Sequence, residues 1–237
     1  MIKSVKPIIA IVPAAGIGSR MKINQPKQYL TIHGKTIIEY AIASLLAHPA
    51  VNRVIVALNP NDDVFNTLPI SSDPRIETVT GGKTRAQSVL SGLNAVSNDY
   101  DWVLVHDAAR PCLIQSDLDE LIKQGEIHKE GAILATPCCD TIKQAVVSES
   151  AISHTVDRSL LWRALTPQLF PRALLLSSLT QAIDENATVT DEASALEYCG
   201  YHPHLVAGRS DNIKVTHPED LALARFYLSA HETEKGE

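Results

Sequence analysis

Continuous apolar runs alternate with amphipathic stretches along most of the chain. Short apolar runs bounded by turn residues predict buried strands, and these runs occupy residues 7–14, 53–59, 75–82, 101–107 and 131–137. Between them, apolar residues recur at helical spacing, which predicts helices over residues 36–49, 84–97 and 116–127. Ser116 is a suitable N-cap for the last of these helices. Strands and helices therefore alternate through the first 137 residues.

This alternation predicts the α/β class. A strand, helix, strand rhythm gives a mostly parallel sheet with helices on both faces, so we expect a Rossmann-like, twisted sheet. In such sheets ligands bind beyond the carboxyl ends of the strands. The chemically notable residues, at 16–27, 81–85 and 107–110, all come directly after predicted strands. The sequence thus places a site at one edge of the sheet.

Residues 137–160 have a different pattern. Apolar and polar residues alternate on either side of the polar turn "SES", which predicts an antiparallel hairpin that leaves the main sheet. A two-stranded hairpin is marginal by itself and needs a packing partner. We therefore expect a protruding β-hairpin arm used in dimerisation, as an extension of a single domain spanning residues 1–237.

The last third of the chain predicts further short elements. We expect helices at residues 159–165, 173–183 and 190–200, and strands at residues 204–208 and 212–216. Thr216 and Glu219 have the spacing of a capping box around Pro218, which would start a final helix. No internal repeat and no low-complexity linker interrupts the chain.

Composition excludes several classes of protein. The chain has 237 residues, 45% of them apolar, and a formal net charge of -6, which argues against a nucleic-acid-binding coat. Its four cysteines form no CxxC pair, so we expect reduced thiols in a cytoplasmic protein. No apolar run approaches the roughly 20 residues of a membrane helix. We therefore expect a soluble protein that binds neither nucleic acid nor membrane.

The loop after the first strand predicts a phosphate site. It contains four small residues that let the backbone approach a ligand closely, namely Ala14, Ala15, Gly16 and Gly18. Arg20 and Lys27 follow, and such cations suit a triphosphate and the charge that develops when it is attacked. Met21 stands where a dinucleotide fingerprint needs its third glycine, and no P-loop G-K-[ST] follows.

Three further segments carry candidate chemistry. In "GGKTRAQSV", Gly82, Arg85 and Ser88 lie at a helix start suited to an anion or nucleotide. In "HDAARP", Asp107 suits Mg²⁺ and Arg110 suits a phosphate, while His106 fits a structural hydrogen bond. In "GRSDNIKVT", Asp211 offers a second carboxylate and Lys214 a second cation, which would complete a magnesium phosphoryl-transfer site. Each segment alone is compatible with ordinary turns and surface charges.

Taken together, the motifs resemble a known family. "PAAGIGSRM" followed by "PKQYL" resembles the opening of nucleotidyltransferases that activate phosphorylated metabolites. "GGKTRAQSVLSGL", "VLVHDAARPC", "DTIK", "HTVDRSLLWRALTPQLF", "TDEASALEYCG" and "DNIKVTHPEDLALA" extend the similarity to roughly residues 8–228. The full set resembles the 2-C-methyl-D-erythritol 4-phosphate cytidylyltransferases of the non-mevalonate isoprenoid pathway.

The resemblance implies a reaction between CTP and methylerythritol 4-phosphate, with Mg²⁺ as cofactor, in a single nucleotidyltransferase domain. Arg20 and Lys27 would be catalytic, and Asp107 and Asp211 would bind the metal. The nucleotide would contact Ala14, Ala15, Gly16, Gly18, Gly82, Arg85 and Ser88. The sugar-alcohol phosphate would contact Arg110, Thr141, Arg158, Thr166 and Lys214, with Thr141 and Arg158 reaching the neighbouring site of a homodimer. Lys83 departs from the family pattern, which often has an acidic residue there.

Three other interpretations remain. A cytidylyltransferase for another polyol phosphate, such as ribitol 5-phosphate, would share the cationic loop and the aspartates. A non-catalytic nucleotide-binding protein would be expected to lack the cations or one carboxylate, and this chain keeps both. A dehydrogenase would need the glycine that Met21 replaces.

Overall fold

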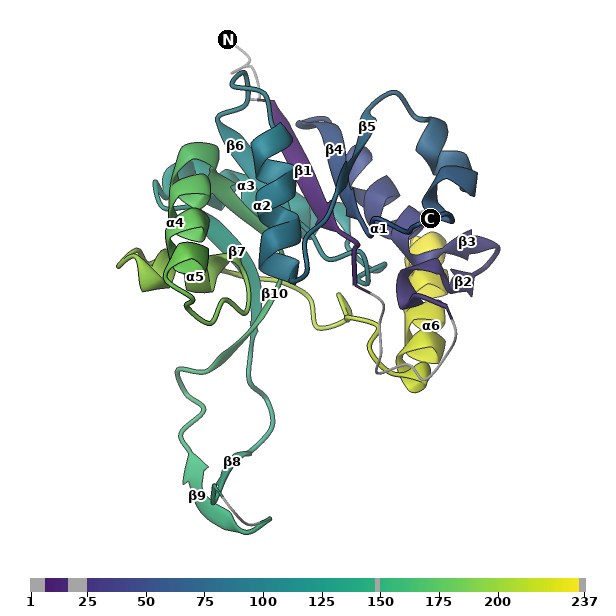
Figure 1. The fold of residues 1–237 in the computed structure, drawn as a ribbon. Coiled ribbons are helices and arrows are strands. Elements are labelled where there is room, and N and C mark those ends of the chain that lie inside the picture. The colour runs from purple at the N-terminus through teal and green to yellow at the C-terminus, as the bar shows by residue number, and fades with distance from the viewer. Residues whose placement is uncertain (1–6, 17–24, 148–149, 235–237) are drawn as a thin grey trace.

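In a computed structural model that describes residues 7–16, 25–147 and 150–234, a seven-stranded sheet forms the centre of the molecule (Figure 1). Its strands are β1 (Ile8–Pro13), β4 (Val51–Leu58), β5 (Ile76–Thr80), β6 (Trp102–Val105), β7 (Ala132–Pro137), β10 (Trp162–Pro171) and β11 (His204–Ala207). The strand order is β11-β7-β10-β6-β1-β4-β5. Only β10 runs antiparallel to its neighbours, β6 and β7. The predicted mostly parallel α/β sheet is confirmed.

Helices cover both faces of this sheet. On one face lie α1 (Ile37–Leu46) and α3 (Gln115–Ile127), and on the other lie α2 (Arg85–Ala95), α4 (Arg172–Asp184) and α5 (Glu192–Tyr198). Alternate residues of β1 face opposite sides of the sheet. Ala10 packs in the hydrophobic cluster that includes α1 and α3, and Ile11 packs in the cluster that includes α2, α4 and α5. Both side chains are fully buried, and each large apolar side chain buried in this way contributes about 1.5–3 kcal/mol.

Polar side chains set where several helices begin. Thr36 and Glu39 form a capping box at α1, and Thr84 and Gln87 form one at α2. The predicted cap of α3 is wrong, because that helix begins one residue earlier, at Gln115, and has no side-chain cap. Ile114 takes the N-cap position with an extended backbone, and the helical backbone follows from Gln115.

Two predictions for the last third of the chain are wrong. The helix predicted at residues 159–165 is absent: residues 162–165 begin β10, a strand inserted between β6 and β7, and residues 159–161 precede it. The predicted stretch is a short apolar run, a pattern that does not distinguish a strand from a helix. Residues 212–216 form a loop rather than a strand. The backbone groups of this loop form hydrogen bonds with side chains and other loops. For example, Asn212 O accepts a hydrogen bond from Arg110 Nη1 at 2.7 Å.

The final helix, α6 (Pro218–Glu234), begins at the predicted proline. Its first turn is held by Asp220 rather than Glu219, because the Asp220 carboxylate accepts hydrogen bonds from the backbone N–H groups of Thr216 and His217, both at 2.8 Å. Near α6 lie the short strands β2 (Thr31–Ile32) and β3 (Lys35–Thr36) (Figure 1). Three 3₁₀ turns complete the described elements: η2 (Lys27–Tyr29), η3 (Phe65–Thr67) and η4 (Pro69–Ser72).

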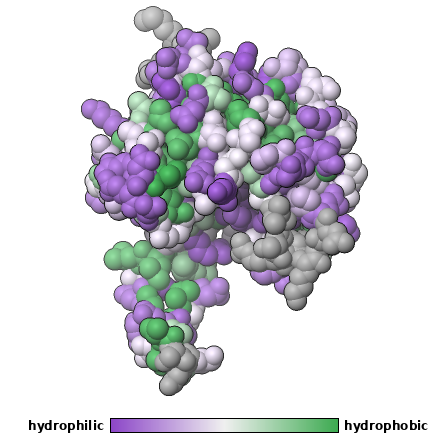
Figure 2. All heavy atoms as spheres, in the orientation of Figure 1, coloured by the Kyte–Doolittle hydropathy of each residue, from purple (hydrophilic) through white to green (hydrophobic). Residues whose placement is uncertain are grey.

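The predicted hairpin is present and stands away from the domain (Figure 1). Its strands, β8 (Ile142–Ala145) and β9 (Ile152–Val156), pair antiparallel in a separate two-stranded sheet. Apolar side chains cover much of its surface (Figure 2), including Val147, Ile152 and Leu160. The use of this arm in dimerisation stays a prediction. Among the described residues, no helix has the length and apolarity needed to span a membrane.

Candidate active site

A cavity of about 350 Å³ lies where β1, β5 and β6 end. This is the edge of the sheet at which the sequence placed a site. Of the predicted site residues, those that line the cavity are Ala14, Ala15, Gly16, Lys27, Gly82, Arg85, Ser88, Asp107 and Lys214. Four segments that are distant in sequence therefore meet here. Gly18 and Arg20 lie outside the described residues.

The opening loop is held by polar side chains on its carbonyl groups. Gln28 Nε2 donates to Ala14 O at 2.9 Å, and Asn59 Nδ2 donates to Ala15 O at 3.2 Å. A Cβ atom added at Gly16 would meet no atom within 4 Å, so the backbone there borders open space. Because the carbonyl groups of Ala14 and Ala15 are anchored, residues 14–16 form a held stretch of main chain on which a ligand can lie closely.

The turn between β5 and α2 packs directly on this loop. A Cβ atom at Gly81 would lie 2.6 Å from Ala15 Cβ, so glycine is required for this close approach. Ser88 Oγ accepts the N–H of Gly82 at 3.1 Å and donates to Thr84 O at 2.9 Å. Ser88 is therefore occupied in shaping the turn, while its neighbour Lys83 is an exposed cation on the cavity wall.

Two lysines approach the cavity from different segments. Lys27, in η2, donates from Nζ to Val215 O at 2.8 Å, which joins the opening segment to the loop of residues 208–216. Lys214, in that loop, lies with Nζ 2.7 Å from Asp107 Oδ2. The two ammonium groups thus face a space that anionic groups of a ligand can enter.

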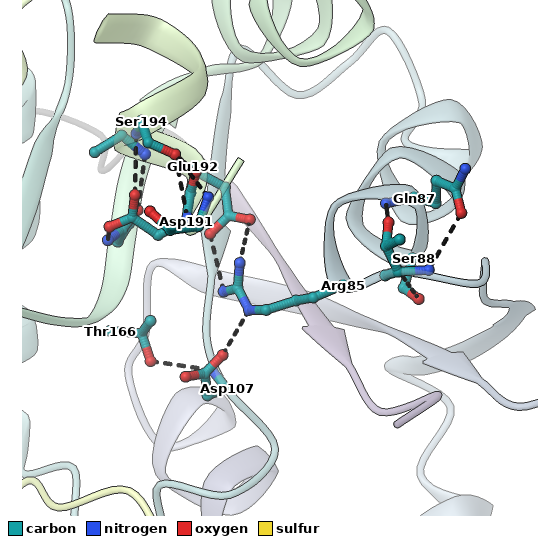
Figure 3. A network of polar contacts seen from close by, with 12 residues as sticks. Arg85, Gln87, Ser88, Asp107, Thr166, Asp191, Glu192 and Ser194 are labelled. Carbon is teal, nitrogen blue, oxygen red and sulfur yellow. Dashed lines mark hydrogen bonds and ion pairs between the residues drawn. The ribbon is translucent and has the colours of Figure 1, made fainter. Parts of the chain in front are cut away.

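Three cations surround Asp107 after the end of β6, and Figure 3 shows one of them, Arg85, beside the carboxylate. Arg85 Nε lies 2.9 Å from Oδ1, and Arg110 Nε lies 3.7 Å from Oδ2. Burial by itself would raise the pKa of Asp107, but the charges of Arg85, Lys214 and Arg110 outweigh burial and hold its pKa well below the ordinary range. The carboxylate is therefore ionised at neutral pH.

Arg110 and Thr166 lie behind Asp107 and do not line the cavity. Thr166 Oγ1 accepts the N–H of Asp107 at 3.0 Å and contacts His106 Nδ1 at 3.0 Å. His106 Nε2 lies 3.1 Å from Arg110 O. Burial lowers the pKa of His106 to about 4, so the neutral ring donates from Nε2 and accepts at Nδ1. As expected, His106 makes structural hydrogen bonds.

Asp211 does not join Asp107 at the cavity. Its carboxylate accepts from Arg209 Nε at 2.9 Å and lies 3.1 Å from His231 Nε2 of α6. Burial raises the pKa of Asp211, but its hydrogen bonds with Arg209 and His231 have the larger combined effect and lower it. In the parts of the chain that the structure describes, no cluster of three or more His, Cys, Asp or Glu side chains could hold a metal ion.

Thr141 and Arg158 belong to the arm and are also absent from the cavity lining. Both side chains are exposed. Arg158 Nη1 donates to Cys139 O, a bond that crosses the base of the hairpin. Within one chain, the predicted substrate residues are thus divided between the cavity, the layer behind Asp107, and the arm.

Sequence reasoning missed two buried residues that shape the site. Gln28 anchors the opening loop, and Glu192, at the start of α5, pairs with Arg85. Gln28 was not recognisable because glutamine in a short segment carries no chemical signature of its own. Glu192 was missed because an acidic residue in the first turn of a helix usually only complements the helix dipole.

Comparison with known proteins shows the family of this chain. Residues 8–230 match the model of the family described as 2-C-methyl-D-erythritol 4-phosphate cytidylyltransferase. The enzyme of that name from Cronobacter sakazakii is 59% identical over 229 residues, 97% of each chain. That from Serratia proteamaculans is 60% identical over 223 residues, 94% of each chain.

A solved structure extends the agreement to the fold. The crystal structure of the Francisella tularensis 2-C-methyl-D-erythritol 4-phosphate cytidylyltransferase is 35% identical to this chain. The match has a TM-score of 0.81 and covers 93% of this chain and 99% of that one. With its cation-lined cavity, its sheet topology and these full-length matches, the chain belongs to the 2-C-methyl-D-erythritol 4-phosphate cytidylyltransferase family.

Proposed function

We propose that this protein transfers the cytidylyl group of CTP to 2-C-methyl-D-erythritol 4-phosphate and releases pyrophosphate, in isoprenoid precursor synthesis by the non-mevalonate pathway. The observation that carries the proposal is the cavity itself. A bare, anchored loop, two lysines and the buried Asp107 meet at one edge of the sheet, in a chain that matches this family over nearly its whole length. The four free thiols suit a reducing compartment, so we propose a cytoplasmic location.

In the proposed reaction, a phosphate oxygen of the second substrate attacks the α-phosphorus of CTP. A new P–O bond forms as the bond to the β-phosphate breaks, and the electron pair leaves with pyrophosphate. Lys27, with Arg20, would stabilise the charge that accumulates on the phosphate oxygens. The opening loop and the turn that carries Gly82 and Ser88 would hold the nucleotide against the backbone. Positioning and charge would then supply most of the catalysis.

Mg²⁺ fits part of this site. Magnesium is commonly held by one or two carboxylates together with substrate phosphates, and Asp107 is the carboxylate that lines the described cavity. Because Asp107 lines the cavity and Asp211 does not, we assign the metal to Asp107. Asp211, the second predicted ligand, is paired with Arg209 and His231 and would have to leave them to reach the ion. When bound, the ion would neutralise charge on the triphosphate.

The second substrate would enter between the cavity and an arm. Lys214 would face the phosphate of this substrate, together with Arg110 and Thr166, which lie behind Asp107. Thr141 and Arg158 stand on an arm that extends away from its own domain, and its exposed apolar side chains need cover. We therefore propose a homodimer in which each arm supplies Thr141 and Arg158 to the partner's site.

Pyrophosphate release by the purified protein tests this function. CTP, UTP, ATP and GTP would each be combined with methylerythritol 4-phosphate or with ribitol 5-phosphate, with and without Mg²⁺. We expect release only with CTP, methylerythritol 4-phosphate and the metal. Release with the ribitol ester alone would overturn the substrate assignment but not the chemistry. Silence in every combination would overturn the catalytic proposal.

A further inference from the structure

We infer that Glu192 is a positioning residue that fixes Arg85, and through Arg85 the carboxylate of Asp107, at the floor of the cavity. The inference rests on the proposed function, since it assigns a purpose to Asp107 in the reaction. Figure 3 shows the guanidinium of Arg85 between the two carboxylates, which come from α5 and from the end of β6.

The geometry joins the two carboxylates through one rigid group. Arg85 Nη1 lies 2.7 Å from Glu192 Oε1, Nη2 lies 3.0 Å from Oε2, and Nε lies 2.9 Å from Asp107 Oδ1. Three of the five guanidinium donors are therefore committed. Because the guanidinium is planar and its donors point in fixed directions, rotation about the bonds to Glu192 would displace the donor that holds Asp107.

Glu192 is itself firmly held. Its side chain is 0% exposed, and it stands directly after Asp191, which caps α5 by accepting the N–H of Ser194 at 3.0 Å. Gln168 of β10 accepts the N–H of Ala193 at 3.1 Å and donates to Asp191 Oδ2 at 2.8 Å. A chain of contacts thus runs from the central sheet, through the first turn of α5, to Arg85 and Asp107.

A role in stability alone explains this pair poorly. Buried ion pairs often stabilise a fold no better than well-packed apolar residues of similar volume. This pair is also directed at a functional position, because Asp107 lines the cavity. Lys214 binds the other oxygen of Asp107 at 2.7 Å, so Arg85 and Lys214 together fix the orientation of the carboxylate, and Glu192 acts on the Arg85 half of this arrangement. Small misplacements of a reacting group cost up to about 100-fold in rate.

The test compares three variants by steady-state kinetics and thermal unfolding. Glu192→Gln keeps the shape but places an amide N–H₂ against the guanidinium. Glu192→Asp keeps the charge. Asp191→Ala is the matched control, because it removes the side-chain cap of the same helix without touching Arg85. We expect Glu192→Gln to lower kcat about 10- to 100-fold, to change the KM for CTP much less, and Glu192→Asp to recover most of kcat.

The outcomes separate the inference from the proposed function. Asp191→Ala should lower the unfolding temperature while keeping kcat within about threefold. If Asp191→Ala lost as much kcat as Glu192→Gln, or if Glu192→Gln kept normal kcat, Glu192 would be merely structural. Should Glu192→Gln fail to fold, Arg85→Lys replaces it, because a lysine cannot bridge both carboxylates, and normal kcat in it would overturn the inference. Wild-type protein without turnover would instead overturn the proposed function.

Discussion

The cavity and the arm are built in opposite ways. At the cavity, Asp107 is almost fully buried, and its carboxylate is held by side chains from α2, from its own strand end and from the loop of residues 208–216. On the arm, Leu160 is 87% exposed, and Arg158 donates a hydrogen bond to Cys139 O at the base of the same hairpin. The charged groups of the cavity are packed by their own chain, while the arm exposes apolar side chains that the described part of its own chain does not cover.

This difference separates two kinds of functional residue. Groups that act on charge in the reaction need a low-dielectric, preorganised setting, and the domain supplies it through the sheet and its helices. Groups on the arm have no such setting within one chain and would obtain it from a second copy. We therefore expect substitutions in the cavity to reduce the rate of chemistry, and those in the arm to weaken substrate binding and assembly.

The largest effect is expected for Lys27→Ala. Removing this ammonium from the cavity should lower kcat about 100- to 1,000-fold, as for other groups that stabilise transition-state charge, while the KM for CTP changes only a few-fold. Lys83→Ala is the control, because Lys83 also lines the cavity but is exposed, and it should keep kcat within about threefold. Equal losses in both variants would show that general positive charge, not Lys27, is required.

A smaller effect is expected for Arg158→Ala on the arm. Loss of one charge-assisted hydrogen bond to the substrate phosphate should raise the KM for methylerythritol 4-phosphate about 10- to 100-fold and leave CTP binding, measured by calorimetry, unchanged. Lys143→Ala removes another arm cation, one that bonds only to Thr155 in the described chain, and should have little effect. A loss of CTP affinity in Arg158→Ala would contradict the division between the two regions.

Mixing two defective chains tests whether the arm crosses to the partner, provided that activity is measured at a methylerythritol 4-phosphate concentration well below the raised KM of Arg158→Ala. If each site combines one chain's cavity with the other's arm, equal amounts of Lys27→Ala and Arg158→Ala chains should form mixed dimers with one intact site. About a quarter of all sites would then be active. No recovery after subunit exchange, verified by mass spectrometry, would place Arg158 at the site of its own chain.

Leu160→Ser should weaken assembly at least tenfold, because burying one leucine side chain contributes about 1.5–3 kcal/mol and a symmetric dimer contains the substitution twice. Sedimentation velocity over a range of concentrations measures the dimer dissociation constant. Leu223→Ser, on α6, is the control, since Leu223 is 41% exposed but lies outside the arm. An unchanged dissociation constant in Leu160→Ser would mean that the apolar side of the arm does not pack on a partner.

The smallest expected difference between the two regions is in the reactivity of their thiols, and it should not affect the rate of catalysis. Burial raises the pKa of Cys112 to about 12, so this thiol stays protonated and unreactive well above neutral pH. Cys139, on the arm, is exposed. In the Leu160→Ser variant, iodoacetamide at pH 8 should modify Cys139 and leave Cys112 intact, as read by peptide mass spectrometry. Modification of Cys112 before Cys139 would contradict the packed state of the core.

Several parts of the fold were predictable because local chemistry determines them. The apolar run at β1, the helical spacing of apolar residues over residues 84–97 and the alternation in the arm each predicted the element that forms. The helix predicted at residues 159–165 failed because its apolar residues fit either structure, and the gap between β6 and β7 decided for a strand. The strand predicted at residues 212–216 failed for a related reason, since Arg110 and Lys27 bind its carbonyl groups.

The sequence by itself determined the class of fold, the edge of the sheet that carries the site, and the residue types that meet there. Periodicity, glycine turns and clustered charges are local properties, and they can be recognised without knowledge of the packing. Only the tertiary structure decided which charges pair. Glu192 pairs with Arg85, which is 107 residues away in the sequence. Asp211 pairs with His231 and does not join Asp107 at the cavity. Such pairings depend on distances between separate elements, which no local pattern encodes.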